Sequence, residues 1–90
     1  MANTTYRVIG YGHANAGFFN QFNFASTYAS AMNEYRNLIA DCEMDGAVLI
    51  EVNHEDWRVI EEFGSGYLIS VVCGPLGNFK VTKSPELVMV

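Results

Sequence analysis

One apolar stripe at helical spacing constrains the fold of this chain more than any other feature. The stripe repeats at three- and four-residue steps, as one face of an α-helix does. It consists of Tyr28, Ala31, Met32, Tyr35, Leu38, Ile39 and Cys42. Ser26 or Thr27 can cap the amino end, and Gly46 can take the left-handed conformation that ends many helices. The pattern predicts one amphipathic helix over about residues 26–45, whose stripe must pack against another layer.

Strand-like segments lie on both sides of this helix. Residues 4–12 are rich in β-branched and aromatic side chains. Residues 18–24 form either a second strand paired with the first or an aromatic loop, and we expect the strand. After the helix, residues 67–73 are apolar on both faces, which is typical of a central strand covered on both sides.

A hairpin over residues 47–63 follows the helix directly. Its turn is Asn53-His54-Glu55-Asp56. A symmetric register pairs Val52 with Trp57, Glu51 with Arg58, Ile50 with Val59, Leu49 with Ile60 and Val48 with Glu61. This register sets opposite charges against each other in one pair, which favours cross-strand packing.

Two short C-terminal segments complete the pattern, a strand at residues 78–82 and an edge strand that residues 86–90 can add. The element order is then β-β-α-β-β-β. Adjacent strands with short turns indicate an antiparallel sheet. The sequence therefore predicts a single α+β domain over residues 1–90, with one helix packed on a sheet of four to six strands.

Composition excludes several classes of partner. The five bases are scattered and the net charge is −5, whereas nucleic-acid binding depends on clustered Lys and Arg. The N-terminus lacks the pattern of a signal peptide, and the apolar stretch at residues 67–73 is far too short for a membrane span. We therefore expect a cytoplasmic protein that binds neither membranes nor nucleic acid directly.

The residues that could carry chemistry do not form a known motif. His13, Cys42, His54 and Cys73 lack the close pairing of a metal site. Both cysteines lie in apolar settings, so we expect them reduced, unlinked and buried. The glycines at 10, 12 and 17 are not followed by the helix and lysine of a phosphate loop, and they predict a strand with a bulge or close packing instead. We expect no catalytic residue, no metal and no cofactor.

The charge distribution points to a binding surface. Eight of the ten carboxylates lie in residues 41–62 with Arg58 as the single base among them, and the first 33 residues contain no acid. Acids near a helix C-terminus oppose its dipole, so their presence there suggests a use. We expect contact with a basic protein surface through six residues, in two patches if the hairpin forms as described: Asp41, Glu43, Asp45, Glu55, Asp56 and Glu62. A merely solvated surface is the alternative.

The phenylalanine-rich segment allows a second interpretation. Phe18, Phe19, Phe22 and Phe24 alternate with amides, and they either pack in the core or form an exposed apolar patch. In the latter case the chain is an assembly or accessory subunit that forms a homodimer or larger oligomer through this segment and an edge strand.

The capped helix at residues 26–46 and the tight hairpin at residues 48–63, in so small and acidic a chain, resemble the small inhibitor proteins that phages carry against bacterial defences, such as anti-CRISPR proteins. The resemblance covers most of the chain, but it rests on size, acidity and architecture and contains no diagnostic motif. It implies a non-enzymatic inhibitor that blocks a basic, nucleic-acid-binding site on a host protein complex.

Overall fold

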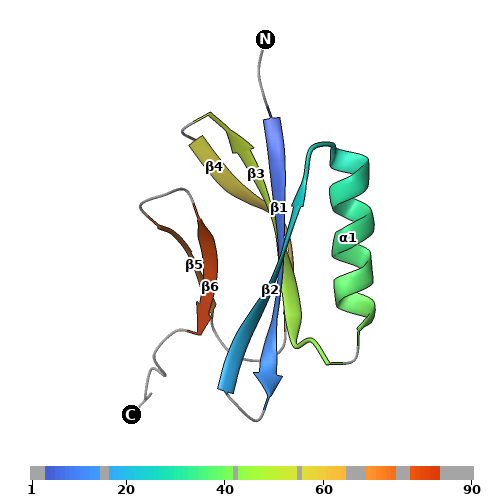
Figure 1. Ribbon diagram of the computed structural model, residues 1–90, viewed down its shortest axis with the longest axis vertical. Coiled ribbons are helices and arrows are strands. Elements are labelled where there is room, and N and C mark those ends of the chain that lie inside the picture. Colours follow the sequence, from blue (N-terminus) through green and yellow to red (C-terminus); the bar gives the residue numbers. More distant parts are fainter. Residues whose placement is uncertain are drawn as a thin grey trace.

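The computed structural model describes residues 4–14, 17–41, 43–54, 56–64, 69–74 and 78–83. It confirms the α+β class and the predicted element order (Figure 1). The elements are β1 (Thr4–Ala14), β2 (Gly17–Ala25), α1 (Tyr28–Ala40), β3 (Gly46–Asn53), β4 (Asp56–Phe63), β5 (Ile69–Cys73) and β6 (Phe79–Lys83). Residues 18–24 are thus a strand and not a loop. The edge strand predicted at residues 86–90, Cys42 and Glu55 lie outside the described residues.

The strands form two sheets rather than one. A four-stranded antiparallel sheet has the order β2-β1-β3-β4, and β5 pairs with β6 in a separate two-stranded sheet. Helix α1 lies on one side of the large sheet and the β5–β6 hairpin on the other, which gives three layers (Figure 1). The expectation that residues 67–73 form a central strand was therefore wrong.

The central strands of the large sheet are β1 and β3, and both are buried on two faces. All residues from Val8 to Gly12 and from Gly46 to Ile50 are buried. Alternate side chains enter two separate clusters, since neighbours in a strand point to opposite faces. The helix-side cluster contains Val8, Leu49, Ala31, Tyr35 and Leu38. The hairpin-side cluster contains Ile9, Tyr11, Val48, Ile50, Phe79 and Val81.

Helix α1 is shorter than the sequence predicted. Thr27 is the N-cap as expected, and its Oγ1 accepts a hydrogen bond from the Ser30 N–H at 3.2 Å. The helix ends at Ala40 because Asp41 turns to an extended conformation and its Oδ1 accepts from the Glu43 N–H at 2.9 Å. The expectation that Asp41, Glu43 and Asp45 occupy the last helical turns was therefore wrong.

Two further details of the predicted helix differ in the structure. Gly46 does not cap the helix but begins β3, where a Cβ atom would lie 2.3 Å from the Phe63 carbonyl oxygen. Tyr28, expected in the buried stripe, is 49% exposed and meets Tyr6 edge-on. Burial of the stripe begins one turn later, at Ala31.

The β3–β4 hairpin has the predicted register only near its turn. Val52–Trp57, Glu51–Arg58 and Ile50–Val59 are paired as expected. A bulge between Leu49 and Ile50 then shifts the pairing, so Leu49 lies opposite Glu61 and Val48 opposite Glu62. The inserted residue is Ile60, which packs against the helix-side cluster.

The glycines of β1 provide close packing, as the sequence predicted. A Cβ atom on Gly10 would lie 3.0 Å from Leu38 Cδ2, and one on Gly12 would lie 2.8 Å from the Glu43 carbonyl oxygen. Cys73 differs from expectation, because it is free but exposed on β5. No helix among the described residues is long and apolar enough to cross a membrane.

Candidate acidic interaction surface

The antiparallel topology brings the end of α1, the end of β1, the start of β3 and the end of β4 to one end of the molecule (Figure 1). Two contacts hold this end together. The Asp45 N–H donates to the Tyr11 carbonyl at 2.8 Å, and the Tyr11 hydroxyl donates to the Phe63 carbonyl at 3.4 Å. Tyr11 therefore joins the loop after the helix to the last residues of β4.

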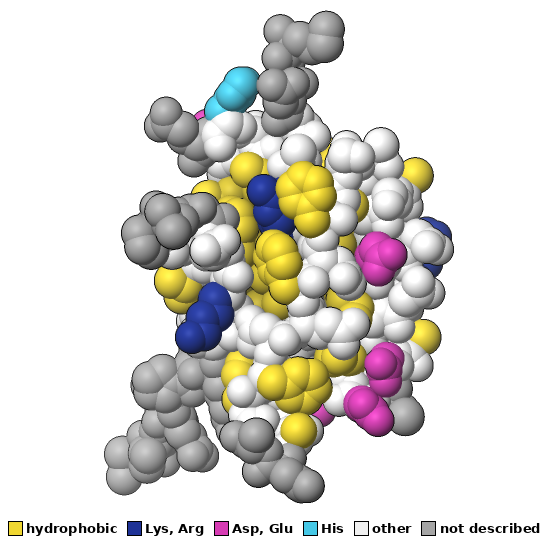
Figure 2. Space-filling view, viewed as in Figure 1, with side chains coloured by type: hydrophobic (Ala, Val, Ile, Leu, Met, Phe, Trp, Pro, Cys, Tyr) yellow, Lys and Arg dark blue, Asp and Glu magenta, His cyan; other side chains and the backbone are white. Residues whose placement is uncertain are grey.

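Five carboxylates gather at this end, which we call the acidic end: Asp41, Glu43, Asp45, Glu61 and Glu62. Asp41 and Glu43 project from the loop after α1, and Glu61 and Glu62 from the end of β4; these four residues are exposed, whereas Asp45 is half-buried. Figure 2 shows acidic side chains gathered toward the end where α1 finishes. Loop and strand thus bring together acids that are 16 or more positions apart in sequence.

The negative charge of this cluster affects the pKa values of two buried tyrosines. Burial raises the pKa of Tyr11, and the nearby charges of Glu62 and Asp45 raise it further. Burial also raises the pKa of Tyr35 on α1, with added contributions from Glu61, Glu62 and Tyr11. Glu62 thus acts on one tyrosine from each face of the sheet.

One acid of this cluster has a basic partner. The His13 Nδ1 atom lies 2.9 Å from Asp45 Oδ2, and the His13 ring meets Phe18 edge-on. This pair fixes the loop after α1 to the end of β1. Asp45 therefore positions the loop as well as carrying a surface charge, whereas Glu43 and Glu62 are more exposed.

One predicted site residue, Asp56, lies at the opposite end of the molecule. Asp56 begins β4 beside the β3–β4 turn and is exposed. Glu62 is six positions further along β4, a distance of about 20 Å. Glu55 lies outside the described residues. The structure therefore brings Asp41, Glu43, Asp45 and Glu62 together and leaves Asp56 apart from them.

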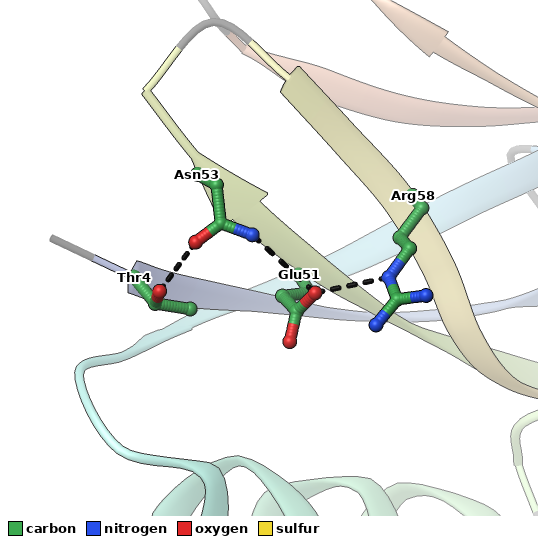
Figure 3. A network of polar contacts seen from close by, with 4 residues as sticks. All are labelled: Thr4, Glu51, Asn53 and Arg58. Carbon is green, nitrogen blue, oxygen red and sulfur yellow. Dashed lines mark hydrogen bonds and ion pairs between the residues drawn. The ribbon is translucent and has the colours of Figure 1, made fainter. Parts of the chain in front are cut away.

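A polar network near that turn neutralises another acid of the run (Figure 3). The Arg58 Nε atom donates to Glu51 Oε1 at 3.0 Å, and the Asn53 side chain donates to the same oxygen at 3.4 Å. The Thr4 hydroxyl donates to Asn53 and so joins the start of β1 to the network. Glu51 thus links β3 to β4, and its charge is paired with that of Arg58.

Glu61 is the member of the acidic end that sequence reasoning missed. A regular hairpin pairs Glu61 with Val48, whereas the bulge at Ile60 pairs it with Leu49 and brings it within reach of Tyr35. The bulge has no clear sequence signal, because Ile60 fits a regular strand equally well.

The described residues hold no group of three or more His, Cys, Asp or Glu side chains placed to bind a metal ion. A groove between β2 and the β5–β6 hairpin is lined mainly by apolar side chains, among them Phe18, Phe79 and Val81. None of the five carboxylates of the acidic end lines this groove. The chain has no significant match among protein families, curated proteins or solved structures.

Proposed function

We propose that this protein is a non-enzymatic binding protein whose acidic end docks on a basic surface of a partner protein. One observation carries this proposal: α1, β3 and β4 gather five carboxylates at a single end, three of them from the loop after the helix and two from β4. Complementary charge of this kind accelerates encounter and sets orientation.

The inhibitory role that the resemblance implies is part of the same proposal. A basic surface that binds nucleic acid would be covered by the acidic end, and the nucleic acid would be excluded by competition. Five carboxylates are too few to imitate a length of duplex, which carries about one charge per 1.7 Å of axis. Local blocking of a site fits the geometry better than mimicry of a strand.

Matched charge reversals test this proposal once a partner has been captured from a lysate and identified by mass spectrometry. The Glu43→Lys/Glu62→Lys variant reverses two exposed charges at the acidic end. We expect its association rate to fall by about tenfold or more at low salt, because steering charges are lost. We also expect the variant to weaken competition between this protein and nucleic acid for the partner.

The control is the Glu55→Lys/Asp56→Lys variant, which makes the same change in net charge and includes Asp56 at the opposite end. It should associate at a rate close to that of the wild type. If both variants associate as the wild type does, the acidic end serves solubility alone and the proposal is wrong. If both are slowed equally, net charge matters and the position of the acids does not.

A further inference from the structure

The two edges of the four-stranded sheet are protected very differently. Edge strand β4 carries four charged residues in eight positions and contains the bulge at Ile60. Charges and bulges are the usual means of preventing a sheet edge from pairing with another chain. Edge strand β2 has neither: its nine residues, Gly17–Ala25, include no charge and no proline, and its pairing with β1 is regular.

One side chain of β2 already binds another strand within the chain. The Asn20 side chain donates to the Val81 carbonyl at 2.9 Å and accepts from the Val81 N–H at 2.7 Å. Its amide thereby binds β6 as a neighbouring strand would. The rest of the strand, from Gln21 to Ala25, includes two large exposed side chains, Phe22 at 47% and Phe24 at 58%.

The backbone groups of these two phenylalanines point away from the sheet. The Tyr11 carbonyl faces β3, since it accepts from the Asp45 N–H. The backbone N–H and C=O groups of successive residues point to alternate sides of a strand. Those of Val8 therefore point toward β2, and those of its partner Asn23 point back toward β1. The N–H and C=O groups of Phe22 and Phe24 are therefore directed outward, toward the open edge.

We propose that a second copy of this chain pairs with this edge, with β2 antiparallel to β2 of the partner subunit about a two-fold axis at Asn23. Phe22 then lies opposite the partner's Phe24, and Phe24 opposite the partner's Phe22, in two hydrogen-bonded pairs. This register uses the outward groups of both phenylalanines, avoids Asn20, and ends where the chain leaves β2 at Ser26. The two large sheets join into one of eight strands.

The charge distribution directs a second copy of this chain to this edge rather than to the acidic end. Each copy carries a net charge of −5, and the first 33 residues, which include β2, contain no acid. Two copies therefore repel least where their β2 edges meet. Figure 2, which views the molecule from the β2 side, shows hydrophobic side chains there around one basic group. The Arg7 guanidinium lies 4.4 Å from the centre of the Phe24 ring.

The antiparallel arrangement also keeps the acidic ends apart. Strand β2 begins at Gly17, near the acidic end, and runs away from it to Ala25. In the proposed dimer the acidic ends of the two copies lie at opposite ends of the joined sheet, so both remain accessible to a partner. The dimer does not depend on the function proposed for the acidic end. The effect of salt distinguishes the two proposals, because salt weakens charge-driven docking and does not weaken apolar pairing.

Cysteine cross-linking tests the axis, in a background in which Cys42→Ala and Cys73→Ser remove the native thiols. In Asn23→Cys the two new thiols lie in a directly opposed, non-hydrogen-bonded pair, where Cα atoms are about 4.5 Å apart and a disulfide fits. In Gln21→Cys the equivalent residues are offset by four positions, about 13 Å, which is too far. Both residues are on the same face of β2, and Gln21 is the more exposed.

We expect a covalent dimer of Asn23→Cys in a glutathione buffer and monomeric Gln21→Cys. Adding Phe22→Lys and Phe24→Lys to Asn23→Cys should abolish the cross-link while the thermal transition persists. Equal cross-linking of the two cysteine variants, or none in either, overturns the proposed pairing. Sedimentation of the wild-type protein over a concentration series is the independent measurement, and a monomer at every concentration overturns the dimer.

Discussion

The two faces of the four-stranded sheet are covered in different ways. On one face a 13-residue helix buries Ala31, Tyr35 and Leu38 against the central strands. On the other face a short hairpin contributes Phe79 and Val81 to the core, while Val72 and Cys73 of the same hairpin remain exposed. The helix face is a continuous packed layer, and the hairpin face depends on a few contacts.

The difference shows that apolar composition alone does not identify a covered strand. Strand β5, Ile69–Cys73, is almost wholly apolar but lies in the outer layer. Strand β3 is covered on both faces because it has β1 and β4 as neighbours and a layer on each side. Position in the sheet, rather than hydrophobicity, decides which apolar run becomes the centre.

The largest expected effect is loss of packing on the helix face. Leu38 is 3% exposed and lies against Gly10. Leu38→Ala should lower the free energy of unfolding by about 2–5 kcal/mol, through lost burial and the cavity that remains. Denaturant unfolding measures this, with Tyr28→Ala at the exposed start of the helix as the control, and a loss below about 0.5 kcal/mol would contradict the packing described.

A double variant sharpens the same prediction. Gly10→Ala alone crowds Leu38, because the new Cβ atom would lie 3.0 Å from Leu38 Cδ2. In the Leu38→Ala background the added methyl group enters the vacated space. The losses of stability in the two single variants should therefore add up to more than the loss in the double variant. Strict additivity would show that the two residues do not share a contact.

A smaller effect is expected on the hairpin face. Asn20→Ala removes both hydrogen bonds to the Val81 backbone and should cost about 1–3 kcal/mol. The fluorescence of Trp57 reports whether the β5–β6 hairpin stays docked, since the centroid of its ring lies 5.1 Å from that of Phe79. We expect altered Trp57 fluorescence before global unfolding in Asn20→Ala and not in Gln21→Ala, whose wild-type side chain is exposed. Identical fluorescence in the two variants would mean that Asn20 does not hold the hairpin.

Alkaline pH tests both faces at once through their buried tyrosines. The pKa values of Tyr11 and Tyr35 are raised above the usual 10.0, so folding favours the protonated phenols. Their contribution to stability is complete below about pH 10 and is lost as the pH rises through the folded-state pKa values. Unfolding measured from about pH 9 upward should show this decline, and Tyr35→Phe should make it less steep. An unchanged slope would mean that folding does not raise the pKa of Tyr35.

The smallest effect is expected in the polar network of Figure 3. The Arg58 side chain is 72% exposed, so its ion pair with Glu51 is screened by solvent. Arg58→Ala should change the free energy of unfolding by about 1 kcal/mol or less. Thermal unfolding at low and high salt measures the effect. A loss larger than that of Asn20→Ala would mean that the ion pair stabilises the fold more than the hydrogen bonds to β6 do.

The local sequence was sufficient to predict those features that depend on a single element. The helical stripe, the Thr27 cap, the β3–β4 turn and the strand at β2 follow from periodicity, side-chain chemistry and turn residues. The helix end was predicted wrongly because Asp41 and Gly46 are both plausible terminators, and Gly46 is held in β3 by its close approach to Phe63. That approach involves a residue 17 positions away.

By itself, the sequence determined the class of the fold, the order of its elements and the concentration of carboxylates in residues 41–62. Only the tertiary structure decided how those carboxylates are divided, because the antiparallel β4 carries Asp56 to one end and Glu61 and Glu62 to the other, and the bulge pairs Glu61 with Leu49 instead of Val48. It also decided that Cys73 is exposed and that β2 is an edge strand. Such properties depend on which strands become neighbours, and contacts between distant residues settle that choice.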